Sequence, residues 1–199
     1  MKILIYVEGG AQGSTKAACR LAFRTFFEKV IPSGTFQVIA SGDRAKAYKD
    51  FCLALAQHPD DYIVLLVDSE EAVVAGPWQH LATRKGDRWR RPDGVTDDQA
   101  HLMVQVMESW FLADRQVLIG FYGQGFLANS LPGYANVEQI PKKAVLQALK
   151  HATKTVKKGE YHKTRHAFEL LERVDPDRVR AASHHAAFLL TVLTREAAR

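Results

Sequence analysis

The sequence predicts an α/β protein with a mostly parallel sheet flanked by helices, followed by a helical carboxyl-terminal extension. The first observation is a set of short, continuous apolar runs, a pattern typical of strands buried on both faces. These runs are residues 3–7, 36–40 and 62–67. The second observation is that two amphipathic, helix-length stretches separate the runs, which favours parallel pairing of the strands. The third is that residues 140–199 contain amphipathic helical patterns and no strand-like run.

The first helix is expected from Ser14, a residue type that caps helices, and is broken by the sequence Pro32-Ser33-Gly34. The second is expected over residues 43–57 and stops before Pro59. In the carboxyl-terminal part we expect three more helices. They are residues 142–153, 161–174 and 183–198.

The length of 199 residues suits one domain, or one domain with a helical appendage. We expect an α/β domain over residues 1–139 and a basic helical extension over 140–199. The composition, with 47% hydrophobic and 25% charged residues, is ordinary for a globular protein. We find no secretory signal and no apolar run long enough to span a bilayer, so no membrane partner is expected. Cys19 and Cys52 lie in apolar helical patterns, which favours reduced, buried thiols and a cytoplasmic setting.

The net charge of +5 is unevenly distributed. Residues 140–199 carry 13 Lys/Arg and 6 Asp/Glu, whereas residues 1–139 carry 14 and 16. A basic segment beside an acidic body can favour a polyanion such as nucleic acid. Helices rich in solvated lysines have the same composition, so both interpretations stay open.

Glu8 follows the first apolar run and precedes a glycine-rich turn with Gly9, Gly10 and Gly13. Such a turn can bind phosphate, but the spacing of the glycines matches neither the P-loop nor the dinucleotide-binding fingerprint. Asp68 and Glu70 follow the third run. Because parallel strands place their sites at their carboxyl ends, Glu8, Asp68 and Glu70 are expected to converge there. Three packed carboxylates repel one another unless a cation neutralises them, which points to Mg2+ or Mn2+.

Residues 97–113 are expected to form a helix capped by Asp97. His101, Gln105 and Glu108 would then share one face of that helix, at i, i+4 and i+7. They could supply an extra metal ligand, a proton relay or a substrate clamp. An ordinary solvated face has the same pattern.

Residues 71–96 show no convincing regular element, which is typical of a lid, a binding loop or disorder. Five basic residues gather in this segment, with Trp78 and Trp89 nearby. They are Arg84, Lys85, Arg88, Arg90 and Arg91. Cations contact phosphates and aromatic rings stack on unpaired bases, so nucleic acid is the favoured partner. A mobile surface loop, or a lid over a smaller phosphorylated substrate, would have the same composition. Lys158 and Lys163, around the start of the middle carboxyl-terminal helix, could stabilise the charge on a transferring phosphate.

The sequence "YVEGG" followed by "VLLVDSE" resembles the Toprim fold, which is shared by topoisomerases, bacterial primases and OLD-type nucleases. A closer resemblance is to a family of small Toprim-like bacterial proteins, domain-of-unknown-function family 4276. It covers nearly the whole chain, through "SGDRAKAYKDF", "DDQAHLMVQVMESWFLAD", "FYGQGF", "LPGYANVEQIPK" and "GEYHKTRHAFELL". The Toprim glutamate then falls on Glu8 and the acid pair on Asp68 and Glu70. The chain departs from the usual pattern at Glu70, where most Toprim domains have Asp.

The resemblance implies Mg2+-dependent cleavage of phosphodiester bonds. Asp68 and Glu70 would hold the metal ion, and Glu8 would bind it or act as a general base. It also implies work beside an ATPase of the ABC or OLD class, in phage defence or a mobile element. The alternatives are a non-catalytic module that binds nucleic acid or an ATPase, and a phosphohydrolase or nucleotidyl-transfer enzyme acting on small nucleotides.

Overall fold

The protein is an α/β structure built on one parallel sheet, as the sequence predicts. The computed structural model describes residues 1–10 and 13–199. The strands of the sheet are β1 (Ile3–Glu8), β2 (Phe36–Gly42), β3 (Tyr62–Asp68) and β4 (Ala100–Met103). They lie in the order β2-β1-β3-β4, and each neighbouring pair is parallel. The three expected strands are confirmed, and β4 was not expected.

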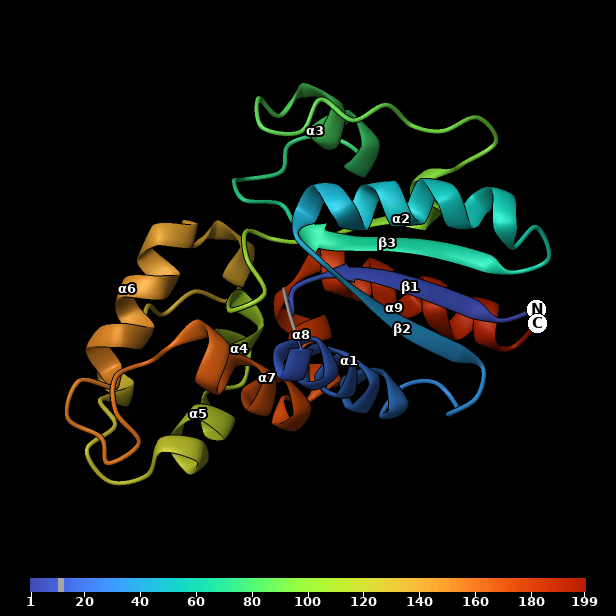
Figure 1. The fold of residues 1–199 in the computed structure, drawn as a ribbon. Coiled ribbons are helices and arrows are strands. Elements are labelled where there is room, and N and C mark those ends of the chain that lie inside the picture. The colour runs from blue at the N-terminus through green and yellow to red at the C-terminus, as the bar shows by residue number, and fades with distance from the viewer. Residues whose placement is uncertain (11–12) are drawn as a thin grey trace.

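Helices cover both faces of the sheet, which explains why its strands are continuously apolar. Ile3, Ile5 and Val7 of β1 point into one hydrophobic cluster, whereas Leu4 and Tyr6 point into another on the opposite face. The first face is covered by α1 (Gly13–Glu28) and α9 (His184–Ala197), and the second by α2 (Arg44–Gln57) and α3 (Pro77–Thr83) (Figure 1). The sheet is therefore the middle layer of three.

Three further helices gather beyond the carboxyl ends of the strands, on the side toward which β3 points in Figure 1. They are α4 (Ser109–Ala113), α5 (Arg115–Tyr122) and α6 (Lys142–Ala152). The helices α7 (Lys163–Arg173) and α8 (Pro176–Ala182) lie beside α1 and α9. Helix α7 packs along α1 and so brings the carboxyl-terminal part of the chain against the end of the sheet. Within the described ranges, no helix combines the length and the apolar character needed to cross a membrane.

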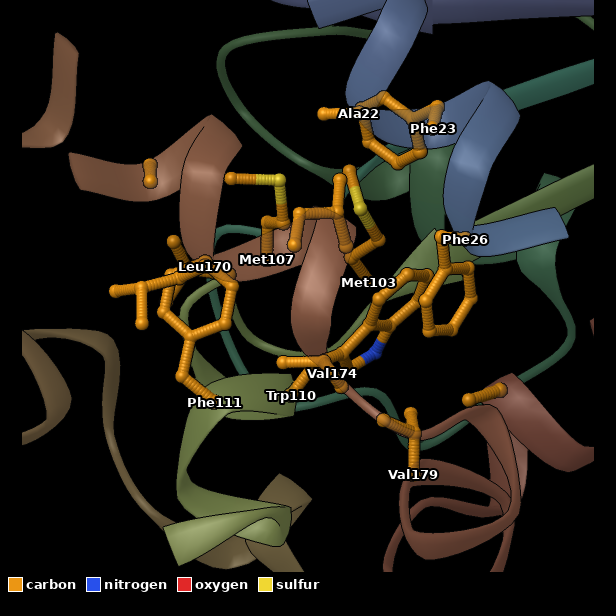
Figure 2. Packing of buried hydrophobic residues seen from close by; sticks show 14 of the residues in the cluster. Ala22, Phe23, Phe26, Met103, Met107, Trp110, Phe111, Leu170, Val174 and Val179 are labelled. Atoms are coloured by element: carbon orange, nitrogen blue, oxygen red, sulfur yellow. The ribbon is translucent and has the colours of Figure 1, made fainter. Parts of the chain in front are cut away.

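One hydrophobic cluster joins the first face of the sheet to these helices. Phe26 of α1 stacks on Trp110 of α4, with ring centroids 5.1 Å apart, and both side chains are fully buried. Figure 2 shows Met103 and Met107 beside this pair, with Leu170 of α7 nearby. Residues from both ends of the chain thus share a single core.

The prediction of a helix over residues 97–113 is wrong. This segment forms a short 3-10 turn (Asp97–Gln99), then β4, then an irregular stretch that leads into α4. β4 pairs with β3 from Leu65 to Asp68, so it satisfies the backbone groups on the open edge of that strand. Both faces of β4 are buried, so its sequence lacks the alternation of apolar and polar residues that identifies a strand. The hydrogen bonds that β4 makes with β3 outweigh its local helical pattern.

The expectation of no regular element between residues 71 and 96 is also wrong, because α3 lies there. Pro77 occupies its first turn, where a missing N–H costs nothing, and Trp78 and Leu81 are buried against the α2 face. Trp89 is buried as well and stacks on Tyr48 of α2 with ring centroids 4.6 Å apart. The two tryptophans therefore belong to the core and do not offer free faces to nucleic-acid bases.

Replacing Phe26 tests whether α1 joins the sheet to the helices beyond it. Phe26→Ala should lower the free energy of unfolding by about 3–5 kcal/mol, because it removes a fully buried ring and leaves a cavity beside Trp110. Leu21→Ala, on the exposed face of the same helix, should cost less than about 0.5 kcal/mol. Urea unfolding of both variants measures the difference in the free energy of unfolding. Equal losses of stability in the two variants would contradict the role of Phe26 in joining the sheet to these helices.

Candidate functional site

Three carboxylates converge where β1 and β3 end. Glu8 is the last residue of β1, Asp68 is the last residue of β3, and Glu70 follows two positions later. Each offers an oxygen atom, and these oxygens all lie within 4.8 Å of one another. The convergence follows from the parallel pairing of the two strands, because their carboxyl ends meet at the same edge of the sheet.

Glu8 is held on both of its oxygens. Its Oε1 accepts a hydrogen bond from the backbone N–H of Asp68 at 2.8 Å, and its Oε2 lies 3.4 Å from the guanidinium of Arg44. The same guanidinium donates to the backbone carbonyl of Asp68. On its other side Arg44 makes a two-pronged ion pair with Asp87, at 2.8 and 2.7 Å. Arg44 therefore ties the ends of both strands to the loop that contains Asp87.

Asp68 is the most buried of the three acids, with 3% of its surface exposed. Its Oδ1 accepts a hydrogen bond from the backbone N–H of Met107 at 2.7 Å, and its Oδ2 lies 3.7 Å from the amine of Lys163. Burial, followed by the charge of Glu8, raises the pKa of Asp68 well above its usual value, although Lys163 acts in the opposite direction. The ionised form of Asp68 is thus disfavoured in this environment, because burial and Glu8 outweigh Lys163.

Glu70 adopts a backbone conformation that is unusual for a residue with a side chain, with φ at 70°. Such a left-handed conformation costs on the order of 1–2 kcal/mol. Its N–H donates to the carbonyl of Gln105 at 2.8 Å, and its carboxylate pairs with Lys142 at 2.5 Å. These contacts hold the strained residue with its side chain turned toward Glu8 and Asp68.

A fourth carboxylate, that of Glu108, lies behind the group. It is fully buried, accepts a hydrogen bond from the hydroxyl of Tyr161 at 2.9 Å and lies 3.8 Å from the amine of Lys163. Its second oxygen is buried with no hydrogen-bond partner among the described residues. Burial lowers the pKa of Lys163, but Asp68 and Glu108 outweigh this effect and raise it above its usual value. Lys163 is therefore a positive charge between two acids, with about half of its side chain exposed.

Of the other two residues of the expected His101–Gln105–Glu108 face, His101 lies away from the acids and Gln105 lies beside them. His101 is in β4, where its Nε2 is 2.9 Å from the carbonyl of Asp98 and its ring meets Phe188 of α9. Burial lowers the pKa of His101 to about 4, so the ring is neutral at physiological pH. The ring faces Phe188 and not the acids. Gln105 takes a supporting position, because its side-chain oxygen accepts from the N–H of Lys142 at 3.0 Å.

The basic residues selected from the sequence separate into three groups. Lys163 lies among the acids, whereas Lys158 lies over the ring of Phe121, 4.6 Å from its centroid, and does not line the pocket at the acids. In the loop, Arg84 pairs with Asp87 at 3.0 Å. The remaining loop residues have exposed side chains. They are Lys85, Arg88, Arg90 and Arg91.

Several residues that complete the site were not expected from the sequence. Arg44 and Lys142 each pair with an acid, and Asp87 fixes Arg44. Arg44 follows the helix cap Asp43, and Lys142 begins α6. Both therefore appear in the sequence as ordinary solvated ends of helices. Only the arrangement of the helices around the strand ends brings them to the acids.

The residues at this edge fit a divalent cation. With Asp87 included, five carboxylates face four basic side chains, those of Arg44, Arg84, Lys142 and Lys163, so the ionised group carries one negative charge in excess. Burial, and then the charge of Glu8, raises the pKa of Asp68, so its ionised form is disfavoured without a further cation. Carboxylate oxygens in this number and spacing are ligands that Mg2+ prefers, and a divalent cation among them would reverse the sign of the excess charge.

Asp68→Asn should make the metal-free protein more stable at pH 8. A carboxyl whose pKa is raised on folding contributes stability that is present below about pH 4 and is lost as the pH rises through the raised pKa. Asp68→Asn has no carboxyl that can lose this stability. In the presence of a chelator at pH 8, its Tm should exceed that of the parent by about 2–4 °C for each kcal/mol of stability that the parent has lost. The difference in Tm should close near pH 4. Thermal melts at both pH values measure this.

Two further measurements complete the test of Asp68. Mg2+ should raise the Tm of the parent and leave that of Asp68→Asn nearly unchanged. Asp60→Asn, which changes an exposed carboxylate, serves as the matched control and should follow the parent throughout. If the Tm of the parent at pH 8 is no lower than that of Asp68→Asn, the charge of Asp68 does not destabilise the metal-free protein.

Comparison with curated proteins and with solved structures gives no match for the chain. One family model matches residues 7–194, a range that includes all five carboxylates and the four basic residues around them. The chain therefore belongs to the family described as Domain of unknown function (DUF4276).

Proposed function

We propose that the protein is a Mg2+- or Mn2+-dependent enzyme that cleaves phosphodiester bonds, with Glu8, Asp68 and Glu70 as its catalytic and metal-binding residues. The observation that carries the proposal is the convergence of their oxygens within 4.8 Å at the carboxyl edge of the sheet. The resemblance of "YVEGG" and "VLLVDSE" to the Toprim pattern supports it, because both acidic motifs follow parallel strands that pair directly.

In this proposal Asp68 and Glu70 hold the cation, directly or through water. When bound, the cation would neutralise charge on the phosphate and lower the pKa of a bound water. Glu8 either shares the cation or accepts the proton of the attacking water, and its hydrogen bond from the Asp68 N–H fixes its orientation for both roles. Lys163 and Arg44 are cations that would stabilise the negative charge of the transferring phosphate.

Nucleic acid is the proposed polymer. The exposed loop residues Lys85, Arg88, Arg90 and Arg91 lie on the segment that Asp87 and Arg44 tie to the acids. Such a basic surface beside a cleavage site would contact the phosphates that flank the reacting one. An ATPase of the ABC or OLD class, in a bacterial defence or mobile-element system, is a proposed partner by analogy with the Toprim nucleases.

A second candidate is a non-catalytic module that binds nucleic acid or an ATPase. The pair between Lys142 and Glu70, at 2.5 Å, favours it, because a lysine on a ligand carboxylate competes with a metal ion. Metal binding separates the two candidates. In the enzyme, Mg2+ displaces Lys142 from Glu70, whereas in the module the salt bridge persists and the cation does not bind.

Glu8→Gln should lower cleavage of a nucleic-acid panel in Mg2+ or Mn2+ by at least about a hundredfold. The amide can still accept the Asp68 N–H bond, but it neither accepts a proton from water nor attracts the cation. Glu71→Gln, in the exposed residue beside the site, is the matched control and should cleave like the parent. The rate of product formation on labelled DNA and RNA is the measurement.

The outcomes of that assay separate the candidates. Cleavage by Glu8→Gln at the rate of the parent would remove Glu8 from the active site. A parent that is inert alone and gains activity with its ATPase would indicate a two-component system. A parent that is inert with every substrate, with and without an ATPase, and does not bind Mg2+ would favour the non-catalytic module.

The loop and the acids should affect binding in opposite ways. Replacing Arg88, Arg90 and Arg91 by Ala should weaken nucleic-acid binding and make its salt dependence shallower, by about one unit of slope for each phosphate that the loop no longer neutralises. Asp68→Ala should abolish turnover and leave binding equal or tighter, because it removes a charge that repels phosphate. A salt titration of affinity beside a cleavage assay measures both effects. Binding by the triple variant that equals the parent at every salt concentration would exclude the loop and strengthen the small-nucleotide alternative.

A further inference from the structure

A pocket of about 610 Å³ opens directly beside the acids. Glu8, Asp68 and Glu70 line it, together with Arg44 and Lys163. This volume lies in the range of sites that enclose a small organic molecule. A carboxylate group that bound only a hydrated cation would not need such a space, so the pocket has room for part of a substrate.

Part of the pocket wall is apolar. It consists of Met103, Met107, Ala167 and Phe168. The two methionines adjoin Asp68, because Met103 pairs with it in the sheet and the Met107 N–H donates to its carboxylate. The two methionines are buried in the core, whereas the ring of Phe168 is only partly covered. Methionine adapts its shape to planar groups and makes favourable contacts with aromatic rings. The wall therefore suits a flat, weakly polar group.

Two glycines that follow β1 line the pocket and pack closely against α1. Gly9 and Gly10 both have positive φ, at 123° and 67°. A Cβ atom at Gly9 would lie 3.1 Å from the sulfur of Cys19 and 3.9 Å from the Phe168 ring, and one at Gly10 would lie 2.7 Å from the backbone of Lys16. The backbone thus approaches α1 and the Phe168 ring closely, and a side chain at either position would press into this packing.

Helix α7 contributes four residues to the pocket. Lys163 and Ala167 are four residues apart, as are Thr164 and Phe168, and all four line the pocket. The rise of an α-helix separates Lys163 from Phe168 by about 7.5 Å along the axis, a little more than one turn. A cation suited to a phosphate and an aromatic ring suited to a base are therefore mounted on one rigid element.

We propose that this pocket binds one unpaired nucleotide, with its phosphate at Lys163 and the acids and its base against Phe168 and the two methionines. The inference rests on the proposed phosphodiesterase activity and names its substrate class, which is single-stranded nucleic acid or a nucleotide extruded from a duplex. A base that is paired and stacked inside a duplex cannot reach such a pocket without leaving the helix. A free mononucleotide has the same chemistry and is the other source of this ligand.

Binding without turnover tests the pocket separately from the chemistry. The probes are a labelled single-stranded oligonucleotide of mixed sequence, the same strand annealed to its complement, and a nucleoside monophosphate as competitor. With Ca2+ in place of Mg2+, fluorescence anisotropy should show tighter binding of the parent to the single strand than to the duplex. Phe168→Ala should weaken single-strand binding by about 5- to 150-fold, the effect of removing one base–aromatic stack.

Three variants isolate the aromatic face. Phe168→Leu keeps the apolar contact with the core and removes the ring, so it should weaken binding even if Phe168→Ala folds poorly. Phe168→Trp should restore binding. Phe188→Ala removes a partly exposed phenylalanine on α9, which packs against His101 and does not line the pocket, and should bind like the parent.

Parent binding that is equal for duplex and single strand, or normal binding by Phe168→Leu, would overturn the inference. Strong competition by the monophosphate would support the pocket and identify small nucleotides as its ligand, whereas weak competition would support it with a polymer. Phe168-dependent binding without any cleavage in Mg2+ would overturn the proposed activity alone. Cleavage of duplex that is insensitive to Phe168 would overturn the pocket alone.

Discussion

The charge of Asp68, buried beside Glu8 at the end of β3, is the constraint on which the rest of the site depends. A buried carboxylate next to a second carboxylate is costly, and the raised pKa of Asp68 expresses that cost. The neighbouring elements supply the compensation, which is a backbone N–H from Met107 and the amine of Lys163. Even so, negative charge remains in excess. A structure that gathers acids and leaves them undercompensated is prepared for a further cation, which is the physical basis for expecting a metal ion there.

The compensating charges come from distant parts of the chain, and this explains why the carboxyl-terminal helices share a core with the sheet. Lys163 begins α7, and its position depends on the packing of α7 along α1. Lys142 begins α6 and is anchored by the side chain of Gln105. Neither amine would reach the acids if these helices were free to move relative to the sheet. The packing of α7 along α1 therefore acts on the electrostatics of the site, because it fixes the helix that carries Lys163 against the covered face of the sheet.

The sequence was sufficient to predict the parallel sheet and the meeting of Glu8, Asp68 and Glu70, because both follow from apolar runs whose carboxyl ends share one edge. It was not sufficient for β4. That segment has the local pattern of a helix and becomes a strand because the edge of β3 requires hydrogen-bond partners. The error displaced His101, which a helix would have placed beside Glu108. The basic partners were missed for a related reason. A lysine or arginine at the end of a helix has no local signal that distinguishes a solvated side chain from one that lies against a buried acid.

The loop around residues 84–91 shows how burial limits the interpretations that its composition allows. As a lid, it would have to move away from the strand ends to admit a substrate. Asp87 is bound on both oxygens by Arg44, and Trp89 is stacked on Tyr48 beneath the same guanidinium, 4.9 Å from it. Opening would separate a buried ion pair, which is strongly unfavourable when one partner stays buried, and would expose an aromatic ring to water. The base of the loop is therefore fixed, and only its basic side chains are exposed. A fixed basic surface beside the acids is better suited to hold the backbone of a bound strand than to close over a small substrate.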